Sequence, residues 1–176
     1  MATLYTIGHS TRTIEELIEA LRAHEVQTLV DIRAFPMSRR LPQFNREALE
    51  KSLAEAGIHY VWTKALGGYR KKVVEESPHI ALRNQSFRNY ADYTLTPEFE
   101  QDALELIALA DKSRTAYMCA ERMYFQCHRM IVSDWLVARG HEVRHIDGAG
   151  PVKTHALSAD GRIVDGRLIY RGDRLL

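Results

Sequence analysis

The sequence has few cysteines, no long apolar run and no large excess of charge of either sign. Its 176 residues include two cysteines, and the formal net charge is +1. No apolar stretch approaches the roughly 18 residues that a membrane-spanning helix requires. Proteins that bind nucleic acid over a broad surface are usually clearly basic, so the near-neutral charge argues against that class. These absences predict a protein that does not bind or span a membrane.

The N-terminal residues also lack the pattern of a secretory signal. Met1-Ala2-Thr3 leads directly into a strand-like run, without a basic segment followed by an apolar one. We therefore expect a cytoplasmic protein, in which thiols normally stay reduced. Arginine supplies 18 of the 24 basic residues, and its guanidinium matches carboxylates and phosphates better than an ammonium does. The bias is consistent with anion recognition and equally with genomic base composition.

Strand and helix patterns alternate along the chain. Short β-favouring runs near residues 4–7, 26–32, 58–62, 115–118 and 143–146 are separated by segments with apolar residues at helical spacing. Strands separated by helices pair in parallel through right-handed crossovers. The sequence therefore predicts an α/β protein, a three-layer sandwich with an open, mostly parallel sheet of about five strands. We expect one domain over residues 1–147 and a tail over residues 148–176, packed on it, in which Asp165-Gly166 indicates a β-hairpin.

Helix start signals support this division. Thr13 and Glu16 have the spacing of a capping box. Asn45 is expected to cap a second helix, and Thr96-Pro97 places a cap before a proline at the first helical position.

Polar residues follow the first expected strand, at the edge of the sheet where open α/β proteins bind ligands. Gly8 ends that strand, and a helix begins a few residues later. The free amides and positive end of the helix suit a phosphate or carboxylate. A plain cap with a surface histidine explains the same pattern equally well. The candidate ligand-binding residues here are His9, Ser10, Thr11 and Arg12.

The second expected strand ends in Asp31-Ile32-Arg33. Asp31 and Arg33 share one side of the strand by its two-residue period, so Asp31 can orient Arg33 or a histidine. Ser38, Arg39 and Arg40 then form either an anion clamp or a solvated basic loop. Further along, Gly67-Gly68 can act as a lid on the same ligand. Tyr90 lines either the pocket or the core.

The fourth expected strand is followed by the stretch richest in reactive side chains. Cys119 and Glu121 come at its end, and Cys127-His128-Arg129 falls at a helix start. Arginine or a helix N-terminus beside a cysteine favours the thiolate. We interpret Cys119 or Cys127 as the group that carries nucleophilic or redox chemistry, with His128 or His9 as the base and Glu121 positioning or exchanging a proton.

Two other interpretations of this stretch stay open. Both cysteines can be small buried hydrophobic residues. They can also contribute to a metal site, although the spacing of eight between them is unusual for structural zinc. A phosphatase loop requires an arginine six positions after the cysteine, and Phe125 stands there. The sequence does not determine whether a cofactor binds. The residues available to a metal are His9, Cys119, Glu121, Cys127 and His128.

Taken together, these motifs resemble a bacterial and archaeal family catalogued as domain of unknown function 488. The resemblance covers about residues 3–147, with one harmless departure, Ile32 in place of a frequent valine. It implies an α/β fold and no settled activity. The matching stretches are Thr6–Thr11, Asp31–Arg33 with Pro36, Ser38 and Arg39, Phe44, Tyr60 with Leu66–Gly68, Phe87 with Tyr90–Tyr93, Met118–Glu121 with Cys127–Arg129, and His145-Ile146, with His155 and Leu168–Tyr170 in the tail.

Three functions remain as hypotheses. The first is an enzyme acting on a small phosphorylated or nucleotide-like ligand, whose anionic group is bound by Arg12, Arg33, Arg39 and Arg129. The second is a nucleic-acid-binding or processing module, in which basic residues grip phosphates and aromatic residues stack on bases. The third is a metal-dependent hydrolase or oxidoreductase. The basic residues of the second hypothesis are Arg39, Arg40, Arg46, Arg70, Lys71 and Lys72.

Overall fold

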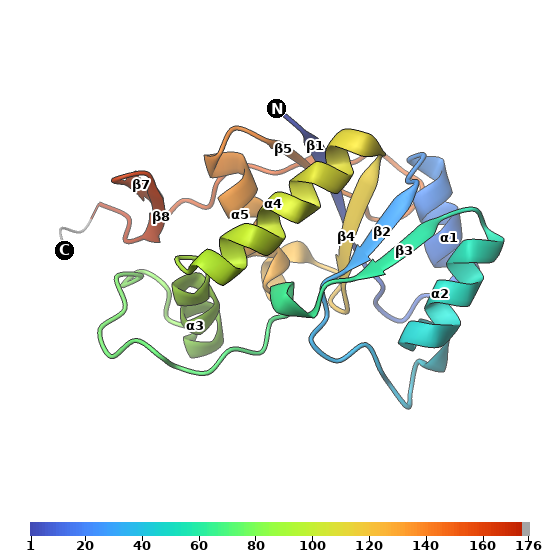
Figure 1. The fold of residues 1–176 in the computed structure, drawn as a ribbon, viewed down its shortest axis with the longest axis horizontal. Coiled ribbons are helices and arrows are strands. Elements are labelled where there is room, and N and C mark those ends of the chain that lie inside the picture. Colours follow the sequence, from blue (N-terminus) through green and yellow to red (C-terminus); the bar gives the residue numbers. More distant parts are fainter. Residues whose placement is uncertain (174–176) are drawn as a thin grey trace.

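A six-stranded sheet in the order β3-β2-β4-β1-β5-β6 forms the centre of the computed structural model, which describes residues 1–173 (Figure 1). The first five strands run parallel, and the short β6 pairs antiparallel with β5. The predicted α/β fold with a mostly parallel open sheet is confirmed. The strands are β1 (Thr3–Gly8), β2 (Thr28–Asp31), β3 (His59–Trp62), β4 (Thr115–Cys119), β5 (Glu142–His145) and β6 (Lys153–Thr154).

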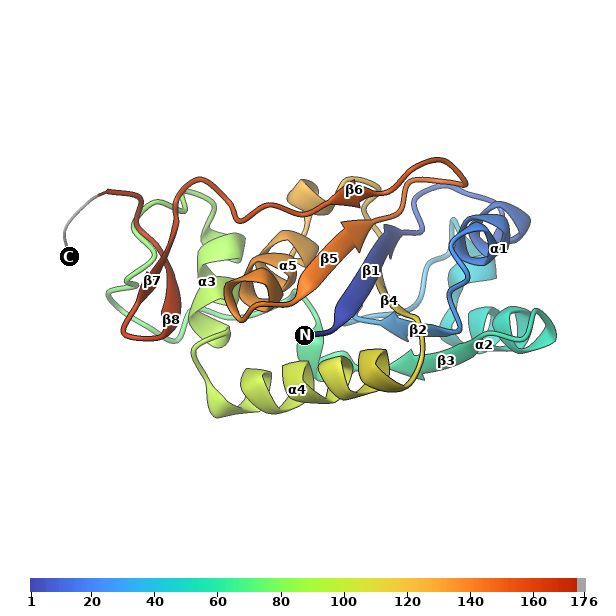
Figure 2. The ribbon, with the colours of Figure 1, turned by 90° about the horizontal axis from the view of Figure 1, so that it is seen from above.

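Helices cover both faces of the sheet (Figure 2). Successive strand residues point to opposite faces, so Leu29 packs with α1 and α2, whereas its neighbour Val30 packs with the helices of the other face. Two separate apolar cores result, which is the basis of the three layers. The helices are α1 (Ile14–Ala23) and α2 (Arg46–Glu55) on one face, and α3 (Gln85–Tyr93), α4 (Pro97–Lys112) and α5 (Arg129–Ala138) on the other.

The helix starts follow the expected signals, with one difference. The capping box of Thr13 and Glu16 and the Thr96 cap are present. Asn45 precedes α2, but its side chain makes no capping bond to that helix. The Asn45 Oδ1 atom instead accepts a hydrogen bond of 2.7 Å from the Ser38 backbone N–H. Asn45 therefore fixes the loop after β2, on the side of the sheet where a ligand is expected.

The tail contains the predicted hairpin, formed by β7 (Gly161–Val164) and β8 (Arg167–Tyr170). Asp165 and Gly166 make its two-residue turn with φ angles of 51° and 77°, which is the left-handed backbone that a type I′ turn requires. The Ala81 N–H donates to the carbonyl oxygen of Tyr170 at 2.8 Å, so the hairpin lies against the segment before α3. Residues 174–176 of the expected tail lie outside the described residues.

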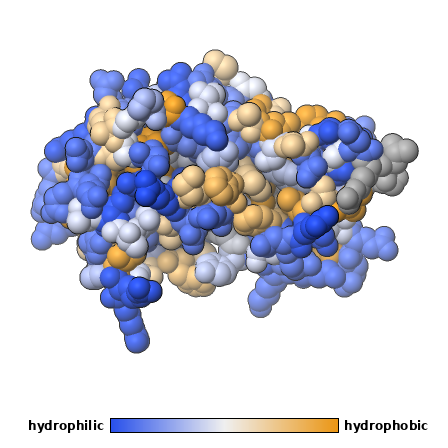
Figure 3. Space-filling view, turned by 180° about the vertical axis from the view of Figure 1, so that it is seen from behind, coloured by the Kyte–Doolittle hydropathy of each residue, from blue (hydrophilic) through white to orange (hydrophobic). Residues whose placement is uncertain are grey.

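The surface on the back of the molecule is mostly hydrophilic, with apolar residues showing in the middle of the view (Figure 3). Within residues 1–173, no helix has the length and apolar character needed to cross a bilayer.

Candidate active site

A cavity of about 510 Å³ opens beyond the carboxyl ends of β1, β2 and β4. This is the edge at which open α/β sheets bind ligands, because the loops after parallel strands converge there. We call it the thiol pocket, since both cysteines line it. The predicted site residues on its wall are His9, Arg33, Ser38, Gly68, Tyr90, Cys119, Glu121, Cys127 and His128.

The two cysteine side chains meet in the wall of the thiol pocket. Cys119 ends β4 and Cys127 precedes α5, and their Sγ atoms are 2.7 Å apart. The hydrogen bond from the Cys119 thiol and the nearby Arg129 lower the pKa of Cys127 to about 7. Burial raises the pKa of Cys119 well above its ordinary value. The pair is therefore unequal at neutral pH, with a large thiolate fraction on Cys127 and a protonated Cys119.

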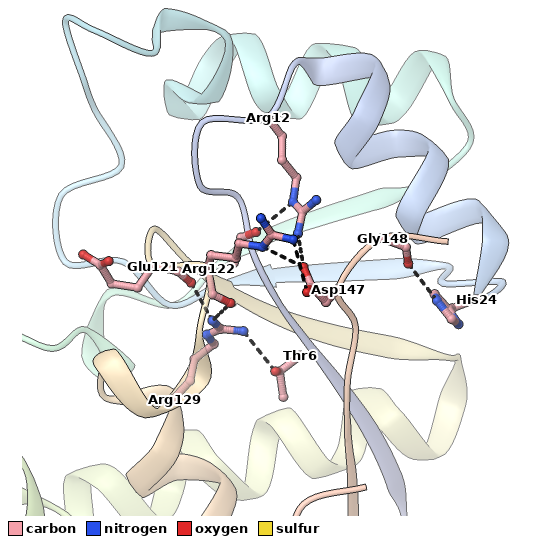
Figure 4. Close-up of polar contacts among 9 residues, drawn as sticks. Thr6, Arg12, His24, Glu121, Arg122, Arg129, Asp147 and Gly148 are labelled. Atoms are coloured by element: carbon pink, nitrogen blue, oxygen red, sulfur yellow. Dashed lines mark hydrogen bonds and ion pairs between the residues drawn. The ribbon is translucent and has the colours of Figure 1, made fainter. Parts of the chain in front are cut away.

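Arg129 lies behind the two thiols and holds them in place. Its guanidinium is buried, and Nε donates to the Cys119 Sγ atom at 3.1 Å. Nη1 donates to the Thr6 hydroxyl, and Nη2 donates to the carbonyl oxygens of Glu121 and Arg122 (Figure 4). These bonds point the Arg129 guanidinium toward protein atoms beside the two thiols.

His128 presents an unprotonated nitrogen to the thiol pocket. Its Nε2–H donates to the carbonyl oxygen of Ile32 at 3.0 Å, which leaves the Nδ1 lone pair free of hydrogen bonds within residues 1–173. A Cβ atom added at Gly68 would lie 2.6 Å from this Nδ1 atom, so the missing side chain at Gly68 leaves room around it. Burial lowers the pKa of His128 to about 4. The imidazole is therefore neutral at pH 7, and its Nδ1 atom can accept a hydrogen bond.

His9 is held by both of its ring nitrogens. Nδ1 donates to the carbonyl oxygen of Ser10 at 2.8 Å, and Nε2 accepts from Arg33 Nη1 at 3.3 Å. The ring stacks on Phe44 with a centroid separation of 4.4 Å. Burial lowers the pKa of His9 to about 4. His9 is therefore neutral at pH 7 and forms part of the pocket wall.

Asp31 fixes the direction of Arg33. The Asp31 carboxylate accepts from Nε at 2.9 Å and from Nη2 at 2.7 Å, and the Tyr60 hydroxyl donates to it at 2.6 Å. Burial and the adjacent Asp31 raise the pKa of Tyr60, so its hydroxyl stays protonated as a donor. The guanidinium that lines the pocket is thereby oriented by the residue two positions before it.

The loop after β1 uses its polar groups within the protein. Ser10 adopts a left-handed backbone with φ 50°, and its N–H donates to the carbonyl oxygen of Ala120 at 2.9 Å. Arg12 pairs with Asp147 at 2.9 Å (Figure 4), and Arg12 does not line the thiol pocket. The Ser10 N–H and the Arg12 guanidinium, both part of the anion site expected before α1, are thus bonded to protein groups. Of the expected ligand-binding residues in the described chain, those outside the pocket wall are Ser10, Thr11, Arg12, Asp31, Arg39, Gly67 and Arg129.

A chain of buried hydrogen bonds connects the thiol pair to the tail. Thr6 bonds the Nδ1 atom of His145 at 2.7 Å, and the Nε2 atom of His145 bonds the Nδ1 atom of His155 at 2.8 Å. The Nε2 atom of His155 then donates to Asp134 at 2.7 Å. In the tautomer in which the Nε2 atoms of His145 and His155 carry the hydrogen, every donor from Arg129 through Thr6 to Asp134 points in one direction. Of these groups, the sequence predicted only Arg129 as a site residue, and not Thr6, His145, His155 or Asp134.

Asp134, in α5, is the last acceptor in this chain of hydrogen bonds. Its carboxylate also accepts from the Tyr170 hydroxyl at 2.7 Å, from the Ser158 hydroxyl at 2.6 Å and from the Ser158 N–H at 3.0 Å. The sequence did contain one signal that Asp134 has partners. Asp134 lies among the inward-facing residues Ile131 and Trp135, and a charged side chain is rarely buried without a partner. Its partners lie in a tail with weak periodicity, so the sequence alone could not name them.

Within residues 1–173, no group of three or more histidine, cysteine, aspartate or glutamate side chains could hold a metal ion. The five candidate ligands, His9, Cys119, Glu121, Cys127 and His128, all line the thiol pocket but do not form such a group.

The fold and the site define an α/β protein with two cysteines in contact at the carboxyl edge of its sheet. A scan against family models matches residues 13–136 to the domain of unknown function DUF488, and the chain belongs to this family. The resemblance inferred from the sequence is confirmed. Comparisons with curated proteins and with solved structures gave no significant match.

The burial of His9 predicts an acid-sensitive fold. A histidine whose pKa falls on folding contributes stability that is present above the unfolded value of 6.5 and is lost as the pH drops toward the folded value of about 4. Between pH 7 and pH 5, the free energy of unfolding of the wild type should fall by about 2 kcal/mol more than that of a His9→Gln variant. Urea unfolding followed by circular dichroism at the two pH values measures this difference.

The exposed His59 on β3 supplies the control for this experiment. A His59→Gln variant should show the same pH dependence as the wild type. Equal losses in the His9→Gln and wild-type proteins would contradict the assignment of a buried, neutral His9.

Proposed function

We propose that this protein is an enzyme that acts on a small anionic ligand, phosphorylated or nucleotide-like, in the thiol pocket, with Cys127 as the nucleophile. The observation that carries the proposal is the placement of the Cys127 thiol, which touches Cys119, lies against Arg129 and opens on a cavity of about 510 Å³. A thiolate is the reactive form of cysteine, and the cavity has the size of small-molecule sites.

The walls of the thiol pocket support a ligand with a flat ring and an anionic group. Aromatic side chains line one part of it, with Phe87 and Tyr90 contributed by α3. Arg33 and Ser38, both in the segment after β2, line the same pocket and can donate hydrogen bonds. A ring stacked among the aromatic side chains would place its anionic group toward those donors.

Two further residues have roles in this proposal. The His128 Nδ1 atom accepts a hydrogen bond from the ligand, because its other nitrogen donates to Ile32. The Glu121 side chain is exposed at the rim and can exchange protons with solvent. Cys127 needs no separate base, since its pKa of about 7 leaves much of it ionised at neutral pH.

A nucleic-acid strand is the second candidate ligand, and the exposed aromatic pair at the pocket mouth favours it. Phe35 is 66% exposed and Tyr69 is 80% exposed, and their ring centroids are 5.5 Å apart. Exposed aromatic rings stack on unpaired bases. Binding that weakens steeply with salt would support this candidate, and binding at background level in low salt would remove it.

The main test compares turnover across a set of phosphorylated and nucleotide-like compounds in three variants. Cys127→Ser should abolish turnover, because a serine hydroxyl stays protonated where the thiol ionises. Gly68→Ala should reduce it strongly, because the added Cβ meets His128 Nδ1 at 2.6 Å. Gly150→Ala is the matched control, since its added Cβ has no neighbour within 4 Å in the described structure.

The thiolate is measured independently of any substrate. Alkylation of Cys127 by iodoacetamide, followed by peptide mass spectrometry, should rise with pH around a midpoint near 7. A midpoint at the ordinary cysteine value of about 8.5, or full turnover in Cys127→Ser, would contradict the proposal.

A further inference from the structure

The closeness of the two sulfur atoms has a consequence beyond the proposed activity. The Sγ atoms of Cys119 and Cys127 are 2.7 Å apart, and a disulfide joins sulfur atoms at about 2.05 Å. These are the two cysteines of the chain. We propose that Cys119 and Cys127 form a reversible intrachain disulfide, with a hydroperoxide as the oxidant. This redox reaction does not require the ligand of the proposed enzyme.

The backbone around the two cysteines allows the bond to form. Cys119 is fixed by β4, whereas Cys127 follows the single-turn helix η3 (Tyr124–Gln126) in the loop that leads to α5. Both side chains belong to the same buried apolar cluster, so no intervening group separates them. Small movements of the loop side chain are sufficient to bring the sulfurs to bonding distance.

The surroundings of the two cysteines also differ in the way that such a reaction requires, with one thiol reacting first and the other second. The Cys127 sulfur lies 2.7 Å from the Cys119 thiol, which can donate to it, and accepts a hydrogen bond of 3.4 Å from the Arg129 backbone N–H. These donors favour its thiolate as the first nucleophile. Cys119 receives the Arg129 Nε–H at 3.1 Å, and this charge favours its own thiolate once Cys127 is oxidised. Both sulfurs line the thiol pocket, through which a small peroxide reaches them.

The reaction has two balanced steps. The Cys127 thiolate attacks one oxygen of the hydroperoxide, the O–O bond breaks, and Cys127 becomes a sulfenic acid while the released alkoxide or hydroxide takes a proton from solvent. The Cys119 sulfur, having lost its proton, then attacks the Cys127 sulfur, and hydroxide leaves with that proton as water. Two thiols and one hydroperoxide thus give one disulfide, one alcohol (or water) and one water. An external thiol reduces the disulfide again.

The test uses the full-length, reduced protein with one equivalent of hydrogen peroxide. Intact-mass analysis should show a loss of about 2 Da, the mass of two hydrogens, and both cysteines should resist alkylation until dithiothreitol is added. In Cys119→Ser, the sulfenic acid on Cys127 has no resolving thiol and should be trapped by dimedone. In Cys127→Ser, dimedone labelling should stay at background.

Several results would overturn the proposal. These are equal dimedone labelling of the two variants, disulfide-linked dimers in place of the intrachain bond, or oxidation of the wild type to sulfinic acid without a disulfide. Thermal melting of both variants verifies that they fold. Turnover is measured separately in dithiothreitol, so a failure of the proposed enzymatic activity leaves the result for the disulfide intact.

Discussion

Replacing Asp134 by alanine is expected to lower the free energy of unfolding by about 3–5 kcal/mol. The Asp134 side chain is fully buried and accepts hydrogen bonds from His155, Ser158 and Tyr170. Alanine leaves these donors without an acceptor in an apolar interior, and each unsatisfied donor costs about 1–3 kcal/mol. Urea unfolding of the variant and the wild type measures the difference.

Asp111 provides the matched control, because it is an aspartate in a helix with an exposed side chain. Asp111→Ala should change stability by no more than about 0.5 kcal/mol. If Asp134→Ala unfolds at the same urea concentration as Asp111→Ala, the buried hydrogen-bond chain does not stabilise the fold. Asp134→Asn keeps the shape of the side chain and removes its charge. We expect this variant to be more stable than Asp134→Ala but less stable than the wild type, because its amide nitrogen cannot accept a hydrogen bond.

Replacing Gly8 by alanine is the second change with a large expected effect. The added Cβ would lie 1.7 Å from the carbonyl oxygen of Glu121 and 2.8 Å from the Cα atom of Arg122. Both are backbone atoms, so the loop after β4 must move. Forced overpacking typically costs about 1–3 kcal/mol, and this contact lies at the severe end. We expect a loss of about 3 kcal/mol in the free energy of unfolding.

The same substitution should alter the thiols. The Glu121 carbonyl accepts a hydrogen bond from Arg129 (Figure 4), so a displaced loop removes one of the bonds that hold the guanidinium against Cys119. The alkylation midpoint of Cys127 should therefore rise in Gly8→Ala. Gly150→Ala should leave both stability and midpoint unchanged. A Gly8→Ala protein with wild-type stability would show that the loop gives way without cost.

Local patterns in the sequence predicted most of the fold. The apolar runs placed the parallel strands, and Asp165-Gly166 placed the hairpin turn. Because parallel strands end at one edge, the cysteines, His9 and Arg33 could be expected to meet there, and the thiol pocket contains all of them. The Asp31–Arg33 pair followed from the two-residue period of a strand.

Contacts between distant segments could not be predicted in this way. Arg12 was assigned to an anion, but its partner is Asp147, which lies 135 positions away. The contact between the two sulfurs depends on how the loop after β4 folds back, and the spacing of eight does not determine that geometry. Arg129 was expected to bind a ligand, yet its partners include Thr6, which lies 123 positions away. Such pairings are set by the tertiary packing of the two cores.

The position of the hairpin has a consequence for how relatives of this chain vary. The family match ends at residue 136, whereas the groups that satisfy Asp134 come from Ser158, His155 and Tyr170. A carboxylate at this helix position is tolerable only in chains that carry those partners. We therefore expect the aspartate and the tail residues to be inherited together, and an apolar side chain to replace the aspartate wherever the hairpin is missing.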